Sequence, residues 1–138
     1  CIRDRIDDKP ILNRSFIYEP DVVVVLDSGL LDAEGANVVA GLKPNGKLIV
    51  NSDKDLHEIS RKLNFKGEIA VVDATSIAIE VLGVPIVNTA ILGAVVKATN
   101  VVDSESIIEV LKKKFPTAAE KNIKAFTTAY DRTVIGRP

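Results

Sequence analysis

Three short, continuous apolar runs constrain the fold of this chain more than any other feature of its sequence. They extend from Val22 to Leu26, from Lys47 to Val50 and from Glu68 to Asp73, and β-branched residues are frequent in them. Runs of this length without polar alternation are typical of strands that are covered on both faces of a sheet. The polar residues that end or follow the runs are Asp27, Asn51 and Asp73. The sequence therefore predicts a sheet with three buried strands.

Segments with helical periodicity lie between and after these runs. The first covers 32–41, with Gly35 and Gly41 as possible breaks. Two helices are predicted between and after the last two strands: one from a cap at Ser52 or Asp53 to Leu63, and one from Thr75 to Leu82. Three more follow in the last third of the chain. They run from a cap at Asn88 or Thr89 to Thr99, from a cap at Asp103 to Phe115, and from a capping box at Thr117 and Glu120 to Tyr130. Strands that alternate with helices predict an α/β domain with a mainly parallel sheet.

The two ends of the chain have weaker patterns. Residues 1–19 carry a turn signal at 7–10 between scattered apolar residues, and we expect a hairpin or an arm there. The α/β core then covers 20–138, and 1–138 forms a single domain. The last four residues, 135–138, are expected to fray or to form a second arm. Because the sequence opens with Cys1 and contains no Met, we expect it to lack an N-terminal segment.

Charge and composition exclude several functions. The formal net charge is -1, from 18 basic and 19 acidic residues, so the chain has no general attraction for nucleic acid or an anionic membrane. No apolar run approaches the length of about 20 residues that a membrane-spanning helix needs. The single cysteine, Cys1, cannot alone bind zinc or an iron–sulfur cluster, so we expect no metal site. One thiol agrees with a reducing cytoplasm, where we expect the protein to act.

Polar residues at the strand ends are the first candidates for a binding site, because parallel α/β sheets bind ligands at the carboxyl ends of their strands. Asp27 could bind a hydroxyl group or cap the following turn, and the same alternatives stay open for Asp73 with Thr75. Asn51 is a further candidate. Other reactive side chains are better explained as solvated or structural: His57, Cys1 and the lysines at 112–114. We predict no catalytic residue.

The stretch from Asn88 to Ala94 combines a polar start with small residues that allow close approach. One interpretation is tight packing between helices or subunits. The other is that helix N-terminal amides near Asn88 and Thr89 meet a ligand or a partner chain. The pattern slightly favours an interface, because exposed apolar surface usually requires a partner.

Several segments, in this order along the chain, resemble the gamma subunit or gamma domain of the 2-oxoacid:ferredoxin oxidoreductases, whose best-known member is pyruvate synthase. The resemblance covers nearly the whole chain, from Ile2 to about Tyr130. It depends on the combination of segments rather than on any one of them. The segments are Asp8-Lys9-Pro10-Ile11, Ile17-Tyr18-Glu19-Pro20-Asp21, Leu42-Lys43-Pro44-Asn45-Gly46, Val72-Asp73-Ala74-Thr75 and the stretch from Val84 to Ala94.

The resemblance implies a Rossmann-like, three-layer domain within a multi-subunit enzyme. Such an enzyme oxidatively decarboxylates pyruvate or a related 2-oxoacid, forms an acyl-CoA and reduces ferredoxin. It also implies partner subunits of alpha, beta and delta type, which hold thiamine diphosphate and iron–sulfur clusters, while the gamma domain lies on the CoA side of the assembly. Asp27, Asn51, Asn88 and Thr89 are then the candidates for contacts with CoA or with another subunit. The glycine-rich first strand and helix of the family are missing from this sequence.

Two alternatives to an inactive subunit of such an enzyme remain open. The polar strand ends favour a stand-alone module that binds CoA or another nucleotide. The small residues after Asn88 favour a purely structural interaction domain, in which a bulky residue at Gly93 or Ala94 would break assembly and leave the fold intact. The sequence does not distinguish between pyruvate and other 2-oxoacids.

Overall fold

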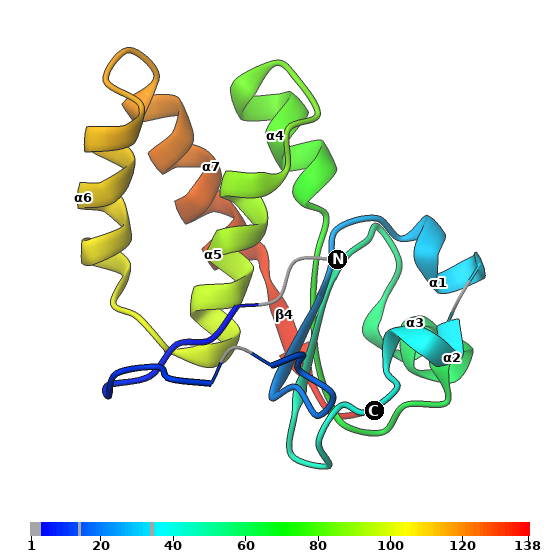
Figure 1. Cartoon of the computed structure of the whole chain (residues 1–138). Helices are drawn as coiled ribbons and strands as arrows, with labels where there is room; N and C mark the ends of the chain where they lie inside the picture. Colours follow the sequence, from blue (N-terminus) through cyan, green and yellow to red (C-terminus); the bar gives the residue numbers. More distant parts are fainter. Residues whose placement is uncertain (1–3, 14, 34) are drawn as a thin grey trace.

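A four-stranded mixed sheet forms the centre of the protein in a computed structural model, which describes residues 4–13, 15–33 and 35–138 (Figure 1). The strands are β1 (Val22–Val25), β2 (Lys47–Asn51), β3 (Glu68–Val72) and β4 (Val134–Gly136), and they lie in this order across the sheet. β1, β2 and β3 are parallel, whereas β4 pairs antiparallel with β3. The register aligns Val22 with Lys47, and Lys47 with Glu68.

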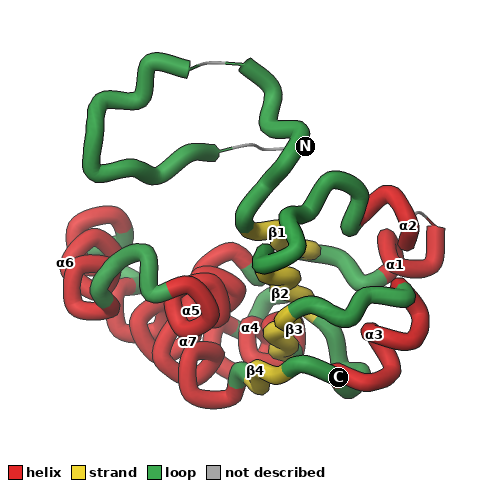
Figure 2. The backbone as a smooth tube through the Cα atoms, turned by 90° about the horizontal axis from the view of Figure 1, so that it is seen from below, coloured by secondary structure: helices red, strands yellow, loops and turns green. Residues whose placement is uncertain are grey.

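Helices cover both faces of this sheet, which gives three layers (Figure 2). One face carries α1 (Gly29–Ala33), α2 (Gly35–Val38) and α3 (Leu56–Leu63). The other carries α4 (Ala74–Leu82), α5 (Asn88–Thr99) and α7 (Ala119–Arg132), with α6 (Ser104–Lys114) packed outside α5 and α7. The predicted α/β domain with a mainly parallel sheet is confirmed.

The continuous apolar runs are explained by a core on each side of the sheet. Leu48 and Val50 point toward α3, where they pack with Ile59, whereas Ile49 points toward α4 and α5. Ile49 and Ile59 are completely buried. Because successive strand residues enter different cores, both sets must be apolar, and the alternation of a one-sided sheet is absent.

Three helix caps differ from the sequence predictions. The cap of α3 is Asp55, not Ser52 or Asp53; its carboxylate accepts a hydrogen bond from the Glu58 amide at 2.8 Å, and this bond lowers its pKa. α5 has Val87 at its cap, and α7 has Ala118, in both cases without a side-chain hydrogen bond. The capping box at 117–120 was therefore a wrong prediction. Burial of their apolar faces, rather than side-chain caps, stabilises α5 and α7.

The edge strand β4 includes Ile135 and Gly136, so the prediction that 135–138 fray or form an arm was wrong for these two residues. Ile135 pairs with Ala70, and Gly136 pairs with Ile69. Lys97 fixes the preceding turn, because its Nζ donates to the carbonyl oxygens of Asp131 and Thr133 at 3.1 and 2.9 Å. The edge strand thus depends on a contact from α5 that is distant in sequence.

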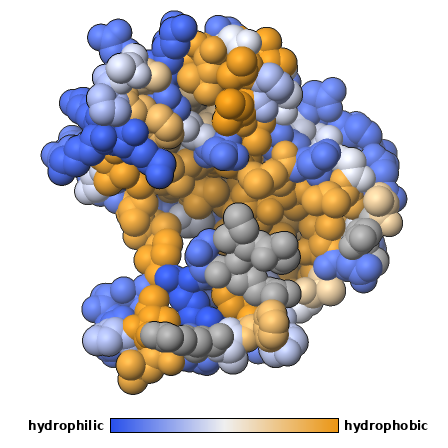
Figure 3. Space-filling view, turned by 45° about the horizontal axis from the view of Figure 1, so that its top comes forward, coloured by the Kyte–Doolittle hydropathy of each residue, from blue (hydrophilic) through white to orange (hydrophobic). Residues whose placement is uncertain are grey.

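The segment before β1 stands away from the sheet. Residues 4–13 and 15–20 contain neither helix nor strand, and they loop outward from the start of β1 (Figure 2). In Figure 3 the same segment projects at the lower edge of the molecule, with apolar surface on it. Leu12 is 89% exposed and Tyr18 is 78% exposed. Cys1, Ile2 and Arg3, which belong to the predicted hairpin or arm, lie outside the described residues.

The helical segment at 32–41 is divided into α1 and α2, and α1 starts earlier than predicted, at Gly29. The chain then turns at Gly41, whose φ is +77°. An added Cβ at Gly41 would clash with the carbonyl oxygen of Tyr18. Gly41 therefore allows the turn before β2 to pack directly on the segment that leads into β1.

An ion pair between α4 and α7 gives a pH-dependent contribution that can be measured. The Arg132 guanidinium donates to both carboxylate oxygens of Glu80, at 2.9 and 3.4 Å, and this bond and charge lower the pKa of Glu80. A carboxyl whose pKa is lowered by folding stabilises the folded protein at pH values above its unfolded-state pKa. This stabilisation is lost as the pH falls through the folded-state pKa. We expect Glu80→Gln to lower the melting temperature slightly at neutral pH and to match the parent in acid. A pH-independent difference would show that the side chain acts through packing instead.

Candidate functional site

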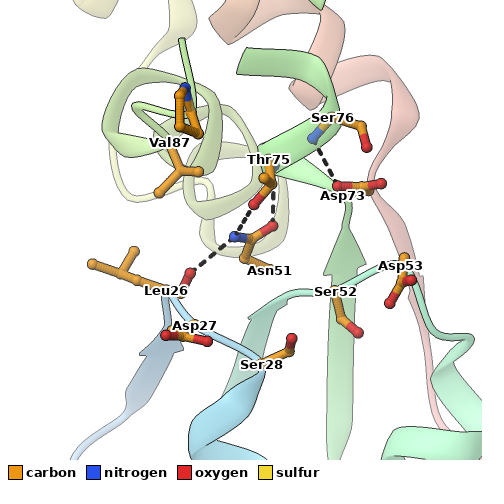
Figure 4. Close-up of a pocket in the computed structure, with 11 residues that line it drawn as sticks. Leu26, Asp27, Ser28, Asn51, Ser52, Asp53, Asp73, Thr75, Ser76 and Val87 are labelled. Atoms are coloured by element: carbon orange, nitrogen blue, oxygen red, sulfur yellow. Dashed lines mark hydrogen bonds between the residues drawn. The ribbon is translucent and has the colours of Figure 1, made fainter. Parts of the chain in front are cut away.

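A cavity of about 540 Å³ lies at the carboxyl ends of the three parallel strands (Figure 4). It is the place at which an open parallel sheet is expected to bind a ligand. The lining comes from the ends of β1, β2 and β3, the start of α4 and the loop before α5. The lining residues are Leu26, Asp27, Ser28, Asn51, Ser52, Asp53, Asp73, Thr75, Ser76, Pro85 and Val87.

Asn51 holds the centre of this site together. Its Nδ2 donates to the Leu26 carbonyl oxygen and to Thr75 Oγ1, both at 2.9 Å, while its Oδ1 accepts from the Thr75 amide at 3.3 Å. The residue is 6% exposed. The side chain therefore joins the end of β1 to the first turn of α4, and Figure 4 shows it between these two elements.

The two aspartates that follow β1 and β3 stabilise the turns in which they lie. Asp27 Oδ1 accepts from the Gly29 amide at 2.8 Å, and Asp73 Oδ1 accepts from the Ser76 amide at 2.9 Å as the N-cap of α4. Both carboxylates also line the cavity. The structural role that the sequence suggested for each is present, and it does not prevent a second role in binding.

The charge of the lining limits what the cavity can accommodate. Asp27, Asp53 and Asp73 contribute carboxylates, and none of the eleven lining residues is Lys or Arg. Hydroxyl groups and the Asn51 amide supply neutral polar atoms. Such a lining suits a hydroxyl-rich or cationic group and disfavours phosphate, because like charges repel strongly in a partly enclosed site. Among the described residues, no group of three or more His, Cys, Asp or Glu side chains could hold a metal ion.

The structure places Asp27 and Asn51 in the lining of the cavity, but the other two candidate residues, Asn88 and Thr89, lie outside it. Thr89 is buried between helices, where its Oγ1 donates to Asn122 Oδ1 at 2.9 Å. Asn122 Nδ2 in turn donates to the Ala118 carbonyl oxygen at 3.0 Å. Asn88 is exposed at the start of α5 and is not part of the lining.

The small residues of α5 pack inside the protein, which corrects the interpretation of this stripe as an interface. Gly93 faces the backbone of α7, and Ala94 is completely buried in the core against the sheet. The apolar surface that suggested a partner chain is covered by α7 of the same chain.

Sequence reasoning missed part of the lining. Ser28, Ser52 and Ser76 each follow a strand end by one to four positions, so the rule that selected Asp27 and Asn51 would also have found them. Pro85 and Val87 had no such signal, because they reach the cavity from the loop after α4. His57 is exposed on α3 and is not part of the lining.

Comparison with known proteins identifies relatives of the whole fold. The model of the pyruvate ferredoxin/flavodoxin oxidoreductase family matches residues 3–132. The chain is 56% identical over 133 residues to the pyruvate/ketoisovalerate oxidoreductases common subunit gamma of Thermococcus kodakarensis, which covers 95% of this chain and 71% of the relative. It is 45% identical over 128 residues to the pyruvate synthase subunit PorC of Methanocaldococcus jannaschii, and this match covers 92% of this chain and 67% of the relative.

A solved structure supports the same relationship. The crystal structure of pyruvate oxidoreductase subunit PORC from Thermotoga maritima superimposes with a TM-score of 0.81 at 36% identity, and the match covers 88% of this chain and 67% of that one. Within the described residues, no helix has the length and apolarity to cross a membrane. The family match, the sequence identities and the shared fold agree, and the chain belongs to the gamma-subunit family of the pyruvate and related 2-oxoacid oxidoreductases.

Proposed function

We propose that this chain is the gamma subunit of a cytoplasmic, multi-subunit oxidoreductase that converts pyruvate or a related 2-oxoacid, with CoA, to an acyl-CoA and CO₂ and passes electrons to ferredoxin. The observation that carries the proposal is the 56% identity to a common gamma subunit over 95% of the chain. In this proposal alpha, beta and delta subunits are the partners, and this chain supplies structure beside their active site.

The proposed cofactors of the complex do not suit the cavity of this chain. Thiamine diphosphate and CoA carry phosphate groups, which would meet Asp27, Asp53 and Asp73 without a lining Lys or Arg. Iron–sulfur clusters require several thiolates, and the sequence contains one cysteine. We therefore assign these groups to the partner chains.

The identities also favour a gamma subunit that is shared by more than one enzyme. The chain is 53 to 56% identical to four gamma subunits described as common to pyruvate and ketoisovalerate oxidoreductases, and 40 to 45% identical to four PorC subunits. We propose that it assembles with two sets of partner chains, one for pyruvate and one for a branched-chain 2-oxoacid.

Affinity purification of the natural protein from its own cells tests this proposal. We expect co-purifying chains with thiamine and iron, activity with both pyruvate and ketoisovalerate, and no 2-oxoacid oxidation by the isolated chain. One set of partners and activity with pyruvate alone would refute sharing but leave the subunit role intact. Recovery of a cofactor-free chain without partners would overturn the subunit role.

A stand-alone module for CoA or a nucleotide is the second candidate, favoured by the position of the cavity at the strand ends. Calorimetric titration of the isolated chain with CoA distinguishes this module from the oxidoreductase subunit. Pantetheine, which lacks the phosphate groups of CoA, is the uncharged comparison. Tight binding of CoA that does not occur with pantetheine would support the module and contradict our reading of the acidic lining.

A further inference from the structure

We propose that Asn45 is a site of spontaneous deamidation that the folded turn before β2 holds in an unreactive geometry. Asn45 and Gly46 form the single Asn-Gly pair in the sequence. In such a pair the backbone nitrogen of the glycine attacks the side-chain carbonyl carbon of the asparagine. Ammonia leaves, a succinimide forms, and one water opens it to aspartate or isoaspartate. Glycine permits the attack because it has no Cβ beside the nitrogen.

The folded turn keeps the attacking nitrogen occupied. The Gly46 amide donates to the Lys43 carbonyl oxygen at 2.8 Å, which closes a turn with Pro44 and Asn45 at its centre. Gly46 is buried, although Asn45 itself is exposed. The amide proton must be removed before the nitrogen can attack, and here it is hydrogen-bonded and shielded from water. The exposed side chain alone does not make the site reactive.

Further contacts fix this turn to the sheet. The Lys43 amide donates to the Pro20 carbonyl oxygen at 3.1 Å, and the Lys47 amide donates to the Asp21 carbonyl oxygen at 2.9 Å. Lys43 Nζ also pairs with Asp21 Oδ1 at 2.6 Å. We expect the Gly46 nitrogen to be released when the hydrogen bonds between 20–21 and 43–47 open, so the reaction records local opening at this end of the sheet.

The product isoaspartate does not fit the closed turn. It adds one methylene to the main chain between the Asn45 Cα and the Gly46 nitrogen, inside the ring that the 2.8 Å hydrogen bond from the Gly46 amide to the Lys43 carbonyl oxygen closes. The register that aligns Val22 with Lys47 starts directly after this point. A chain that opens and reacts is consequently unable to re-form the same turn, and the modification marks it permanently.

The test compares the folded and the denatured chain in mildly alkaline buffer. Mass spectrometry follows conversion of the amide at Asn45, and an isoaspartyl methyltransferase assay identifies the product. We expect the folded chain to react at least about tenfold more slowly than the denatured chain, which corresponds to an opening free energy above about 1.4 kcal/mol. Asn100, also exposed but followed by Val101, is the internal control and should keep its amide.

A variant outside the reacting pair separates turn opening from intrinsic reactivity. Pro44→Ala makes the open turn entropically more accessible, and we expect it to speed the reaction of the folded chain about two- to fivefold without changing the denatured rate. Asn45→Gln should abolish the product in both states. Equal rates for folded and denatured parent chains, or no effect of Pro44→Ala on the folded rate, would overturn the proposal.

Discussion

Gly93→Ala is expected to destabilise the protein by about 3 kcal/mol, at the upper end of the cost of overpacking a core. The new Cβ would lie closer than 3.0 Å to the Phe126 carbonyl oxygen and to the Tyr130 amide nitrogen. Both atoms belong to the backbone of α7, so no side chain can rotate away, and the two helices must separate. Denaturant unfolding followed by circular dichroism should show a lower midpoint and an unchanged slope.

Gly83→Ala is the matched control, because it adds the same methyl group where the structure has no atom within 4 Å. Gly83 ends α4 with a φ of +79°, so we expect a cost of about 1 kcal/mol from backbone strain alone. Equal losses in the two variants would exclude close packing as the cause. A Gly93→Ala chain that keeps its stability and loses only its partner chains would restore the interface suggested by the sequence.

The three parallel strands were predictable because their signal is local and strong. Four consecutive valines at 22–25 tolerate few conformations other than a strand, although β1 lies at the edge of the sheet and Val24 is 39% exposed. In β2 and β3, burial on both faces explains the absence of polar alternation. α4 was equally clear, since Asp73 caps it and Gly83 ends it in the left-handed region. In these elements the local preference and the tertiary packing agree.

Other elements depend on contacts that no local pattern contains. β4 exists because β3 offers a free edge and because Lys97 fixes the preceding turn, and both partners are distant in sequence. α5 starts without a capping side chain. The expected caps were Asn88 or Thr89, but both lie within the helix, and the Thr89 hydroxyl donates to Asn122 on α7. The sequence revealed the polar residue but not which neighbour it would meet.

The same distinction applies to the candidate site. Asp27 and Asn51 were found by the rule for the carboxyl ends of parallel strands, which depends only on strand direction. The rule does not say whether a side chain points into the cavity or is occupied by hydrogen bonds, and Asn51 uses its amide within the protein. Sequence reasoning therefore located the site without assigning the role of its central residue.

Asn51→Leu is expected to destabilise the protein by about 3 kcal/mol, because leucine has a similar size but cannot form the three hydrogen bonds that the buried Asn51 amide makes. The Leu26 carbonyl oxygen, the Thr75 amide and the Thr75 hydroxyl would then lack their partner. Since these groups lie directly after β1 and in the first turn of α4, the wall of the cavity should also loosen. Hydrogen exchange at the Thr75 amide, measured beside denaturant unfolding, checks both effects.

Asn51→Asp distinguishes the loss of hydrogen bonds from a change in packing, because it keeps the shape of the side chain and removes only the donor. Burial and the facing Leu26 carbonyl oxygen should raise the pKa of the introduced carboxyl, whose protonated form can donate again. A raised folded-state pKa gives stability that is complete below the unfolded-state pKa and is lost as the pH rises through the folded-state value. Relative to the parent, this variant should therefore recover in acid, whereas Asn51→Leu should not. Recovery of both variants, or of neither, would contradict the role assigned to the Asn51 amide as the link between β1 and α4.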